Sequence, residues 1–335
     1  CRCHATAEGE DDGRLHPVPI QEKEMKLSVI IPVYNKVDYV RPCIKSLLKQ
    51  DFSDFETILV DDGSTDGSGK LCDELAAQHA QLRVYHTTNQ GVTAARRHGV
   101  EQAQADYILF MDSDDALMTH ALQTLYDTIE KTGADEVIGT FCTQNGIASP
   151  VVYNGLTPVE PLVRQIITGK NRFPVLWAII FRKEILKGCM DIPRDIIEGE
   201  DKLMQVKVLM KQPKVYFIAD QVYRYTLGLP NNRRRTLERE MLYDSILRQT
   251  LEPHWDYYED AFTLHQLKEY EKFIHDGQYE VRKLYYQAQL SSSNVQRPTS
   301  PIPLYDRIVW MLPPALSQPL IKLYKRIIQI KQHNL

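Results

Sequence analysis

Three groups of acidic residues stand at points of the sequence where carboxylates could do chemistry, and the densest follows an apolar run. Asp112, Ser113, Asp114 and Asp115 come directly after the segment 107–111. Three carboxylates so close together repel one another unless a cation neutralises them. Hard oxygen ligands favour Mg²⁺ or Mn²⁺, so this cluster predicts a divalent metal site. A solvated loop that caps a helix is the alternative.

The second acidic group lies at 61–68, where Asp61 and Asp62 precede glycine, serine and threonine residues. These residue types also make ordinary turns and helix caps. In a binding site, a carboxylate at position 61 would accept hydrogen bonds from a ring N–H group or a ribose hydroxyl. The segment is therefore read either as a plain turn or as a nucleoside contact.

The third group, Glu200 and Asp201, stands at an expected helix start. Acidic residues stabilise helix N-termini without any catalytic role. Either carboxylate could also act as a general base toward an acceptor hydroxyl.

A basic residue in another segment could bind phosphate. Arg96 lies in the first half of an expected helix, where it could clamp a diphosphate. Gly91, which precedes this helix, would let the backbone approach such a ligand.

Alternating strands and helices must position these groups. Short β-branched and apolar runs predict buried strands, and helical spacing of apolar residues predicts helices between them. Pro42 is compatible with the first of these helices only if it lies in the first turn. The expected strands span 27–33, 55–60, 82–85 and 107–111, and the expected helices span about 37–48, 68–80 and 92–102.

Four strands that alternate with three helices predict right-handed crossovers and a doubly wound, mainly parallel α/β sheet flanked by helices. In such sheets ligands bind beyond the carboxyl ends of the strands. Tyr34 and Asn35, the 61–64 segment and the 112–115 segment all follow strands, so we expect them on one rim.

The rest of the chain is less regular. We expect strands at 136–141 and 215–219, an apolar stretch at 175–181 and a helix at 201–210. From about residue 231 the chain reads as an α-helical appendage. Residues 1–24 are polar and aperiodic and are interpreted as a disordered leader or extension, with Met25 as the expected natural start. The predicted division is 25–230 for the main domain and 231–335 for the helical region.

Composition excludes several classes of function. The chain has 335 residues, 43% hydrophobic and 25% charged, as in ordinary globular proteins. A net charge of −4 gives no attraction to nucleic acid, so no nucleic-acid partner is expected. The six cysteines lack a disulfide or CxxC pattern and are interpreted as reduced thiols. No apolar run is long enough to span a membrane.

Four motifs in order, LSVIIPVYN, VDDGSTDGS, NQGVTAARRHG and YILFMDSDD, resemble the donor-binding half of family 2 inverting glycosyltransferases with the GT-A fold. The resemblance covers about residues 25–120, and the GED at 199–201 resembles the acceptor-side motif of the family. It implies a donor-binding part at 25–120 and an acceptor part at 121–230. It also implies transfer of a sugar, with inversion, from a nucleoside diphosphate sugar, with a preference for uridine.

The resemblance also assigns roles to single residues. Asp61 would bond the base, and Arg96 would lie near the pyrophosphate, with Ser113 also at the donor. Trp177 would support the acceptor side. The nucleobase pocket would be lined by Pro32, Val33, Tyr34 and Asn35. Asp114 would bind the metal, and Asp112 would bind the metal or contact the ribose. Asp201 would be the catalytic base, and Glu200 would support it.

Departures from the family narrow the expected activity. A QxxRW motif and membrane spans, typical of processive members, are absent, which favours transfer of a single sugar to a glycan or lipid-linked acceptor in cell-surface polysaccharide synthesis. We expect a cytoplasmic protein. The segment 318–335 is amphipathic and basic, which fits either peripheral contact with the inner face of the cytoplasmic membrane or packing on the protein.

Two other classes compete with this interpretation. A haloacid-dehalogenase-like phosphatase also has an apolar strand that ends in DxD, but normally on its first strand. A degenerate transferase could act as a non-catalytic, membrane-associated scaffold, although the intact carboxylates argue against it. A dinucleotide-binding oxidoreductase is disfavoured because neither GxGxxG nor a P-loop follows any expected strand.

Overall fold

The fold is described for residues 25–228, 236–281 and 302–333 of a computed structural model, with side chains up to Ile327 in the last range. The expected leader, 1–24, lies outside the described residues, as do Cys1 and Cys3. Cys43, Cys72, Cys142 and Cys189 are buried free thiols, as expected.

The first half of the chain alternates strand and helix, as predicted. Each strand is an apolar run and each helix buries one face, which is why the pattern could be read from the sequence. The elements are β1 (Leu27–Val33), α1 (Val37–Leu47), β2 (Phe55–Asp61), α2 (Ser68–Gln78), β3 (Leu82–His86), α3 (Val92–Gln102) and β4 (Tyr107–Phe110).

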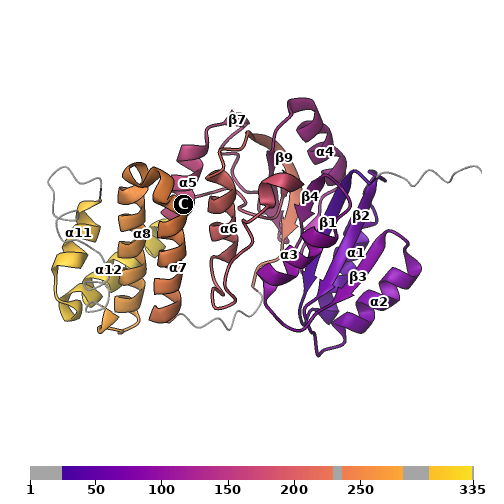
Figure 1. Ribbon diagram of the computed structural model, residues 1–335. Helices are drawn as coiled ribbons and strands as arrows, with labels where there is room; N and C mark the ends of the chain where they lie inside the picture. Colours follow the sequence, from indigo (N-terminus) through magenta and orange to yellow (C-terminus); the bar gives the residue numbers. More distant parts are fainter. Residues whose placement is uncertain (1–24, 229–235, 282–301, 334–335) are drawn as a thin grey trace, which may run out of the picture.

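The second half is more varied and ends in helices that extend away from the sheet (Figure 1). It comprises β5 (Ala116–Leu117), α4 (Ala121–Thr132), β6 (Glu136–Thr143), β7 (Gly155–Thr157), α5 (Val159–Ile167), β8 (Ile179–Arg182), the 3-10 helix η1 (Lys183–Leu186), α6 (Glu200–Leu209) and β9 (Val215–Tyr225). The C-terminal part comprises α7 (Leu237–Leu251), the 3-10 helix η2 (Glu252–His254), α8 (Trp255–His275), α11 (Leu304–Met311) and α12 (Pro314–His333).

One sheet contains all of these strands, in the order β3-β2-β1-β4-β8-β6-β9-β5, and β7 pairs with β9. The pairs β1–β2, β1–β4, β2–β3 and β6–β9 are parallel. Antiparallel pairs are shorter, and β8 forms two of them because it runs opposite to both neighbours, β4 and β6. The expected mainly parallel α/β sheet is therefore confirmed, with a mixed second half.

Apolar cores cover both faces of the sheet. Ile30 and Ile58 point into the core beneath α3, α5 and α6, whereas Val29 and Leu59 point into the core beneath α1, α2 and α4. Alternate residues of each strand therefore face opposite cores, as expected for strands buried on both sides. A third core joins the second half of α8 to α11 and α12.

The sequence-based expectation for Pro42 is wrong. Pro42 lies inside α1, beyond its first turn, because the helix already begins at Val37. A proline there cannot donate a backbone hydrogen bond to the carbonyl group of Asp38. Both residues are exposed, so water can reach this carbonyl and the helix continues.

None of the helices in the described parts of the chain is long and apolar enough to cross a membrane.

Glu136 begins β6 with a fully buried carboxyl group. Burial raises the pKa of Glu136 to about 8, and a hydrogen bond donated by the side-chain amide of Gln205 offsets only part of this effect. The folded protein therefore favours the protonated acid at this position.

The substitution Glu136→Gln should change how stability depends on pH. In the unfolded chain the carboxyl titrates near 4.5, so the folded state holds an extra proton between that pH and about 8. The stability that Glu136 contributes through this proton is thus fully present below about pH 4.5 and is lost as the pH rises through about 8. We expect E136Q to be about 1–3 kcal/mol more stable than the parent at alkaline pH in urea unfolding. The exposed Glu101→Gln is the control, and equal pH profiles for E136Q and the parent would contradict the prediction.

Candidate functional site

A cavity of about 730 Å³ opens beyond the carboxyl ends of β1 and β4. The parallel register pairs Val33 with Asp61 and Ile30 with Phe110, so the loops after these strands meet at one rim. Most residues expected to bind substrate or metal line this cavity. They are Pro32, Val33, Tyr34, Arg96, Asp112, Ser113, Asp114, Trp177, Glu200 and Asp201.

Asn35 does not line the cavity. It adopts a left-handed backbone conformation, φ 51°, directly after β1. Its Oδ1 accepts a hydrogen bond of 2.8 Å from the backbone N–H of Thr65, and its own N–H donates to Oγ of Ser64 at 3.0 Å. In this structure Asn35 ties the loop after β1 to the loop after β2.

Asp61 does not line the cavity either. Oδ1 accepts from the N–H of Ser64 at 3.0 Å, and Oδ2 lies 2.9 Å from Nδ1 of His86. On another side, a Cβ at Gly69 would come within 2.4 Å of Oδ2, so α2 packs directly on this carboxylate. The expected contact between Asp61 and a nucleobase stays a prediction.

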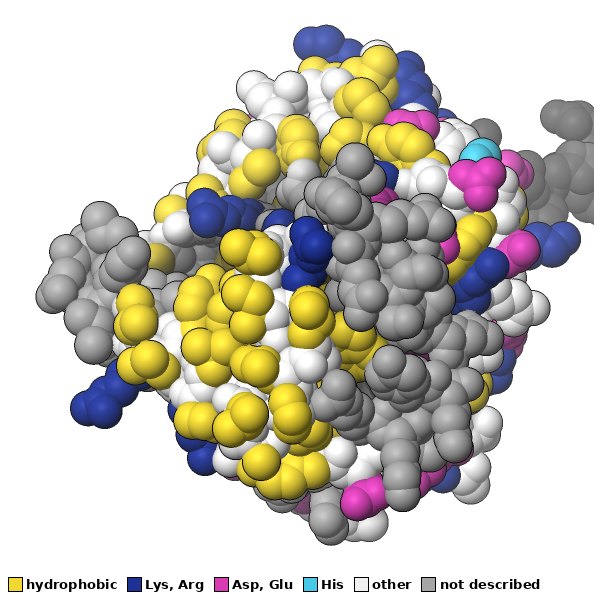
Figure 2. Space-filling model, turned by 90° about the vertical axis from the view of Figure 1, so that its left-hand side faces the viewer, with side chains coloured by type: hydrophobic (Ala, Val, Ile, Leu, Met, Phe, Trp, Pro, Cys, Tyr) yellow, Lys and Arg dark blue, Asp and Glu magenta, His cyan; other side chains and the backbone are white. Residues whose placement is uncertain are grey.

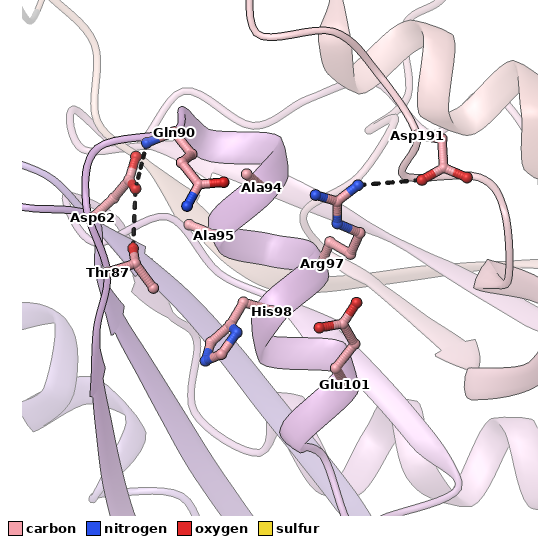
Figure 3. A pocket seen from close by; sticks show the side chains of 9 residues that line it. All are labelled: Asp62, Thr87, Gln90, Ala94, Ala95, Arg97, His98, Glu101 and Asp191. Atoms are coloured by element: carbon pink, nitrogen blue, oxygen red, sulfur yellow. Dashed lines mark hydrogen bonds and ion pairs between the residues drawn. The ribbon is translucent and has the colours of Figure 1, made fainter.

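Asp62 is the acid of this pair that lines the cavity. Its Oδ1 accepts from the N–H of Gln90 at 2.9 Å and from Oγ1 of Thr87 at 3.1 Å (Figure 3). Its Oδ2 accepts from the N–H of Gly91 at 2.8 Å. A single carboxylate thus holds the backbone that leads into α3, the helix that carries Arg96.

Two of the clustered carboxylates each face a cation. Nη2 of Arg96 donates to Oδ1 of Asp112 at 2.8 Å, and Nζ of Lys36 lies 2.5 Å from Oδ2 of Asp114. Arg96 is almost fully buried, yet its Nε and Nη1 have no hydrogen-bond partner. Burial works to lower the pKa of Arg96, but attraction to Asp112, and further to Glu200 and Asp201, raises it overall.

Asp115 is structural. Its Oδ2 accepts from the hydroxyl of Tyr223 at 2.9 Å and its Oδ1 from the N–H of Thr226 at 2.7 Å. The same tyrosine oxygen accepts from the N–H of Asp112 at 3.0 Å, and Thr226 Oγ1 donates to the carbonyl of Asp114. The end of β9 therefore holds the whole 112–115 loop in place.

Glu200 and Asp201 form the first turn of α6, as expected. The segment before them is attached at two points to the side of the cavity formed by α3 and the loop that precedes it. Arg97 of α3 pairs with Asp191 at 3.2 Å (Figure 3), and Arg194 donates to Oδ1 of Asn89 at 2.9 Å. Arg97 and Asp191 also line a second, smaller cavity of about 320 Å³ beside α3. Figure 3 shows the side chains around it.

An aromatic stack forms the opposite wall. Trp177 lies between Tyr223 and Tyr225, with ring centroids 4.9 Å and 5.1 Å apart and interplanar angles of 24° and 12°. Trp177 and Tyr225 line the cavity, so the wall offers ring edges and a hydroxyl to a ligand.

Several cavity residues were not singled out from the sequence, namely Lys36, Asp62, Asn89, Arg194, Tyr225 and Thr226. Lys36 and Asp62 adjoin residues that were, and alternation along β2 could have suggested that Asp61 and Asp62 face opposite ways. Arg194 and Thr226 lie in irregular segments without a periodic pattern, so no local signal marked them.

A second group of potential metal ligands lies among the C-terminal helices. Glu240, Asp244 and His265 each bring a ligand atom within 4.8 Å of the others. Nε2 of His265 is 3.0 Å from Oδ1 of Asp244 and 3.6 Å from Oε1 of Glu240. Burial alone would lower the pKa of His265, but hydrogen bonds with Asp244 and Glu240 raise it to about 9. An ion pair between a protonated histidine and these carboxylates therefore explains why the three side chains lie together.

The known proteins that resemble this chain are glycosyltransferases. Residues 28–188 match the family model for glycosyl transferase family 2. Glycosyltransferase GlyG of Streptococcus pneumoniae serotype 4 is 41% identical over 116 residues, which cover 34% of this chain and 38% of the relative. The uncharacterized glycosyltransferase EpsJ of Bacillus subtilis is 30% identical over 207 residues, which cover 59% of this chain and 60% of the relative. The chain thus spans less than two thirds of the length of either relative.

Solved structures share the fold over nearly the whole chain. The crystal structure of S. aureus TarS 1–349 has a TM-score of 0.61 and 19% identity, and covers 93% of this chain and 92% of that chain. The same protein in complex with UDP-GlcNAc has a TM-score of 0.56 and 21% identity, with 92% of each chain covered. At such identities the likeness concerns the fold, including the C-terminal helical region.

Proposed function

We propose that the chain is a family 2 glycosyltransferase that moves a single sugar from a nucleoside diphosphate sugar to a hydroxyl group with inversion. The acceptor would be a glycan or a lipid-linked glycan in cell-surface polysaccharide synthesis. The observation that carries this proposal is the one cavity where carboxylates from three segments surround the buried Arg96. We place donor binding in residues 25–120, acceptor binding in 121–230 and a helical region in 231–335.

Arg96 supports an anionic donor. Two of its buried nitrogens lack a partner, and such groups are costly unless a ligand completes their hydrogen bonds. A diphosphate offers several acceptor oxygens to a planar guanidinium. Lys36 and Arg194 line the same cavity and add positive charge. A uridine donor is favoured because TarS, which shares the fold, has been crystallised with UDP and with UDP-GlcNAc.

Asp112 and Asp114 are the proposed metal ligands. Their carboxylate oxygens suit Mg²⁺ or Mn²⁺, which bind one or two carboxylates and fill their remaining positions with phosphate and water. The short contact between Asp114 and Lys36 places a positive charge at this carboxylate already, so a metal would compete with the lysine for it. When bound, the metal supplies positive charge that stabilises the departing diphosphate.

Asp201 is the proposed general base, with Glu200 as its support. Both line the cavity, and the N–H of Lys202 donates to Oδ1 of Asp201 at 2.8 Å. Oδ2 of Asp201 would take the proton of the acceptor hydroxyl as its oxygen bonds to the anomeric carbon. The bond between this carbon and the diphosphate oxygen breaks on the opposite side, which inverts the configuration.

Donor binding should be visible as thermal stabilisation. A saturating nucleoside diphosphate sugar with Mn²⁺ should raise the melting temperature by about 5 °C, because a ligand at 100 times its Kd adds about 2.7 kcal/mol. Asp114→Asn should abolish the part of the shift that requires Mn²⁺. The exposed Asp220→Asn is the matched control. Absence of a shift with every nucleoside diphosphate sugar tested would contradict the proposal.

The base is tested by Asp201→Asn. We expect kcat for sugar transfer to fall about 100-fold to 10,000-fold, with Kd for UDP within about twofold of the parent, because the substitution removes proton transfer and leaves the donor side intact. Glu198→Gln is the control, since Glu198 is a nearby acid that does not line the cavity. Full transfer activity in D201N would refute the assignment.

The alternatives have less support. The DSDD segment follows β4, between β1 and β8 in the sheet, whereas a haloacid-dehalogenase-like phosphatase carries this motif on its first strand. The family match favours neither that phosphatase nor a non-catalytic scaffold. Release of phosphate from simple phosphomonoesters, without sugar transfer, would reverse this ranking.

We further propose peripheral contact of the segment 318–335 with the inner face of the membrane. Figure 2 shows apolar side chains gathered on the side of the molecule where α11 and α12 lie, next to lysine and arginine side chains. Leu323 and Ile327 are 57% and 43% exposed on α12, and Lys322 and Arg326 are also exposed. An apolar face with basic neighbours is suited to an anionic bilayer surface.

Point substitutions test this contact better than deletion, because Ser317 and Ile321 of α12 are fully buried and deletion would disturb the third core. The double variant Leu323→Glu/Ile327→Glu should lose most of its sedimentation with vesicles that contain phosphatidylglycerol. Leu156→Glu, which alters an apolar residue 64% exposed on β7, should not. Unchanged sedimentation of the double variant would exclude contact through this segment.

A further inference from the structure

Gly199, the residue before the first turn of α6, is in direct contact with a helix of the C-terminal region. It has a φ of 81°, a left-handed conformation that other residues rarely adopt. A Cβ atom at Gly199 would lie only 2.9 Å from Cε2 of Tyr243, a residue of α7. The tyrosine ring therefore packs against the backbone that immediately precedes Glu200 and Asp201, and α7 lies beside α6 (Figure 1).

Tyr243 is itself held from behind by α8. Its ring centroid is 5.4 Å from that of His265. His265 is fixed by Asp244, whose other carboxylate oxygen accepts from the side-chain amide of Gln266 at 2.9 Å. Asp244 and Gln266 are buried, so these partners have few alternatives to the positions they occupy. The ring of Tyr243 is thus confined between the backbone at Gly199 and a well-anchored imidazole.

We propose that Tyr243 is a positioning residue that fixes the first turn of α6, so that Asp201 keeps its orientation in the cavity. Tyr243 does not line the cavity and has no direct part in the chemistry. This inference rests on the proposed role of Asp201 as general base. It assigns a function to α7 and α8, which complete the acceptor side of the site from outside the strand-and-helix domain.

The geometry explains why a small displacement would matter. Asp201 is the second residue of α6, and the glycine before the helix, Gly199, has a backbone that adopts several conformations without strain, so packing rather than torsional preference must hold this turn. Displacement of a catalytic group by about 1 Å can lower the rate about 100-fold. Loss of the ring would leave a space next to Gly199 and let this turn move, whereas the donor side, held by Asp62 and Tyr223, would stay in place.

Substitution of Tyr243 gives the first test. We expect Tyr243→Ala to lower kcat for sugar transfer about 10-fold to 100-fold, with Kd for UDP by calorimetry within about twofold of the parent. Tyr243→Phe, which keeps the ring, should restore most of the activity. A residue that only stabilises the fold would lower the melting temperature without changing kcat per folded molecule. Such a result for Y243A, at a temperature where the protein is folded, would overturn the proposal.

Gly199 and Tyr243 can also be tested as a pair. In the parent, Gly199→Ala places a methyl group against the ring and strains the backbone, whereas in Y243A only the backbone strain remains. The factor by which Gly199→Ala lowers kcat should therefore be at least about fivefold larger in the parent than in Y243A. The control is Gly188→Ala, because Gly188 has a φ of 72° and no atom within 4 Å of a Cβ. Independent, multiplicative effects of G199A and Y243A would refute the coupling.

Failure of the proposed function is distinguishable from failure of this inference. If D201N transfers sugar at the parent rate, Asp201 is not the base, whatever Tyr243 does. If D201N is inactive and Y243A is fully active, the base assignment stands and the positioning role of Tyr243 is wrong.

Discussion

The site depends on one electrostatic constraint, namely that carboxylates from separate segments face a single cavity. Like charges at such distances are unfavourable in a partly buried place. Arg96 offsets this cost because it pairs with Asp112 and is also attracted to Glu200 and Asp201. Since Arg96 is fixed on α3, which Asp62 anchors, the balance of charge depends on the strand order that brings β1, β2 and β4 together.

The 112–115 loop, which carries two of the cavity carboxylates, is also held by residues from the end of β9. Tyr223 and Thr226 contact Asp115 and the backbone of the 112–115 loop, although they follow it by more than 100 residues. Burial, followed by repulsion from Asp112, raises the pKa of Asp115 to about 7. A buried acid in that environment needs the two hydrogen-bond donors that it receives, so the end of β9 is required to hold the 112–115 loop.

The parts predicted from the sequence were those with local causes. Strands buried on both faces appear as apolar runs, so β1 to β4 and the loops after them were placed correctly. The side to which a loop residue points has a weaker signal. Alternation at the end of β2 suggests that Asp61 and Asp62 face opposite ways, but only their tertiary partners decide which of them faces the cavity. Lys36 meets Asp114 across 78 positions of sequence, which no local pattern marks. The same holds for β8, whose antiparallel insertion between β4 and β6 depends on long-range pairing.

The C-terminal helices are coupled to the sheet domain by the continuity of α8. Tyr258 and Phe262, in the first half of this helix, belong to the core beneath α5 and α6, whereas Tyr270 and Phe273, in its second half, belong to the core with α11 and α12. Helix formation is cooperative along an uninterrupted segment, so order in one half favours order in the other. Separation of the C-terminal helices from the sheet would expose aromatic side chains of the first core. The two parts are therefore expected to behave as one body, which gives α7 a fixed reference from which to support the turn before Asp201.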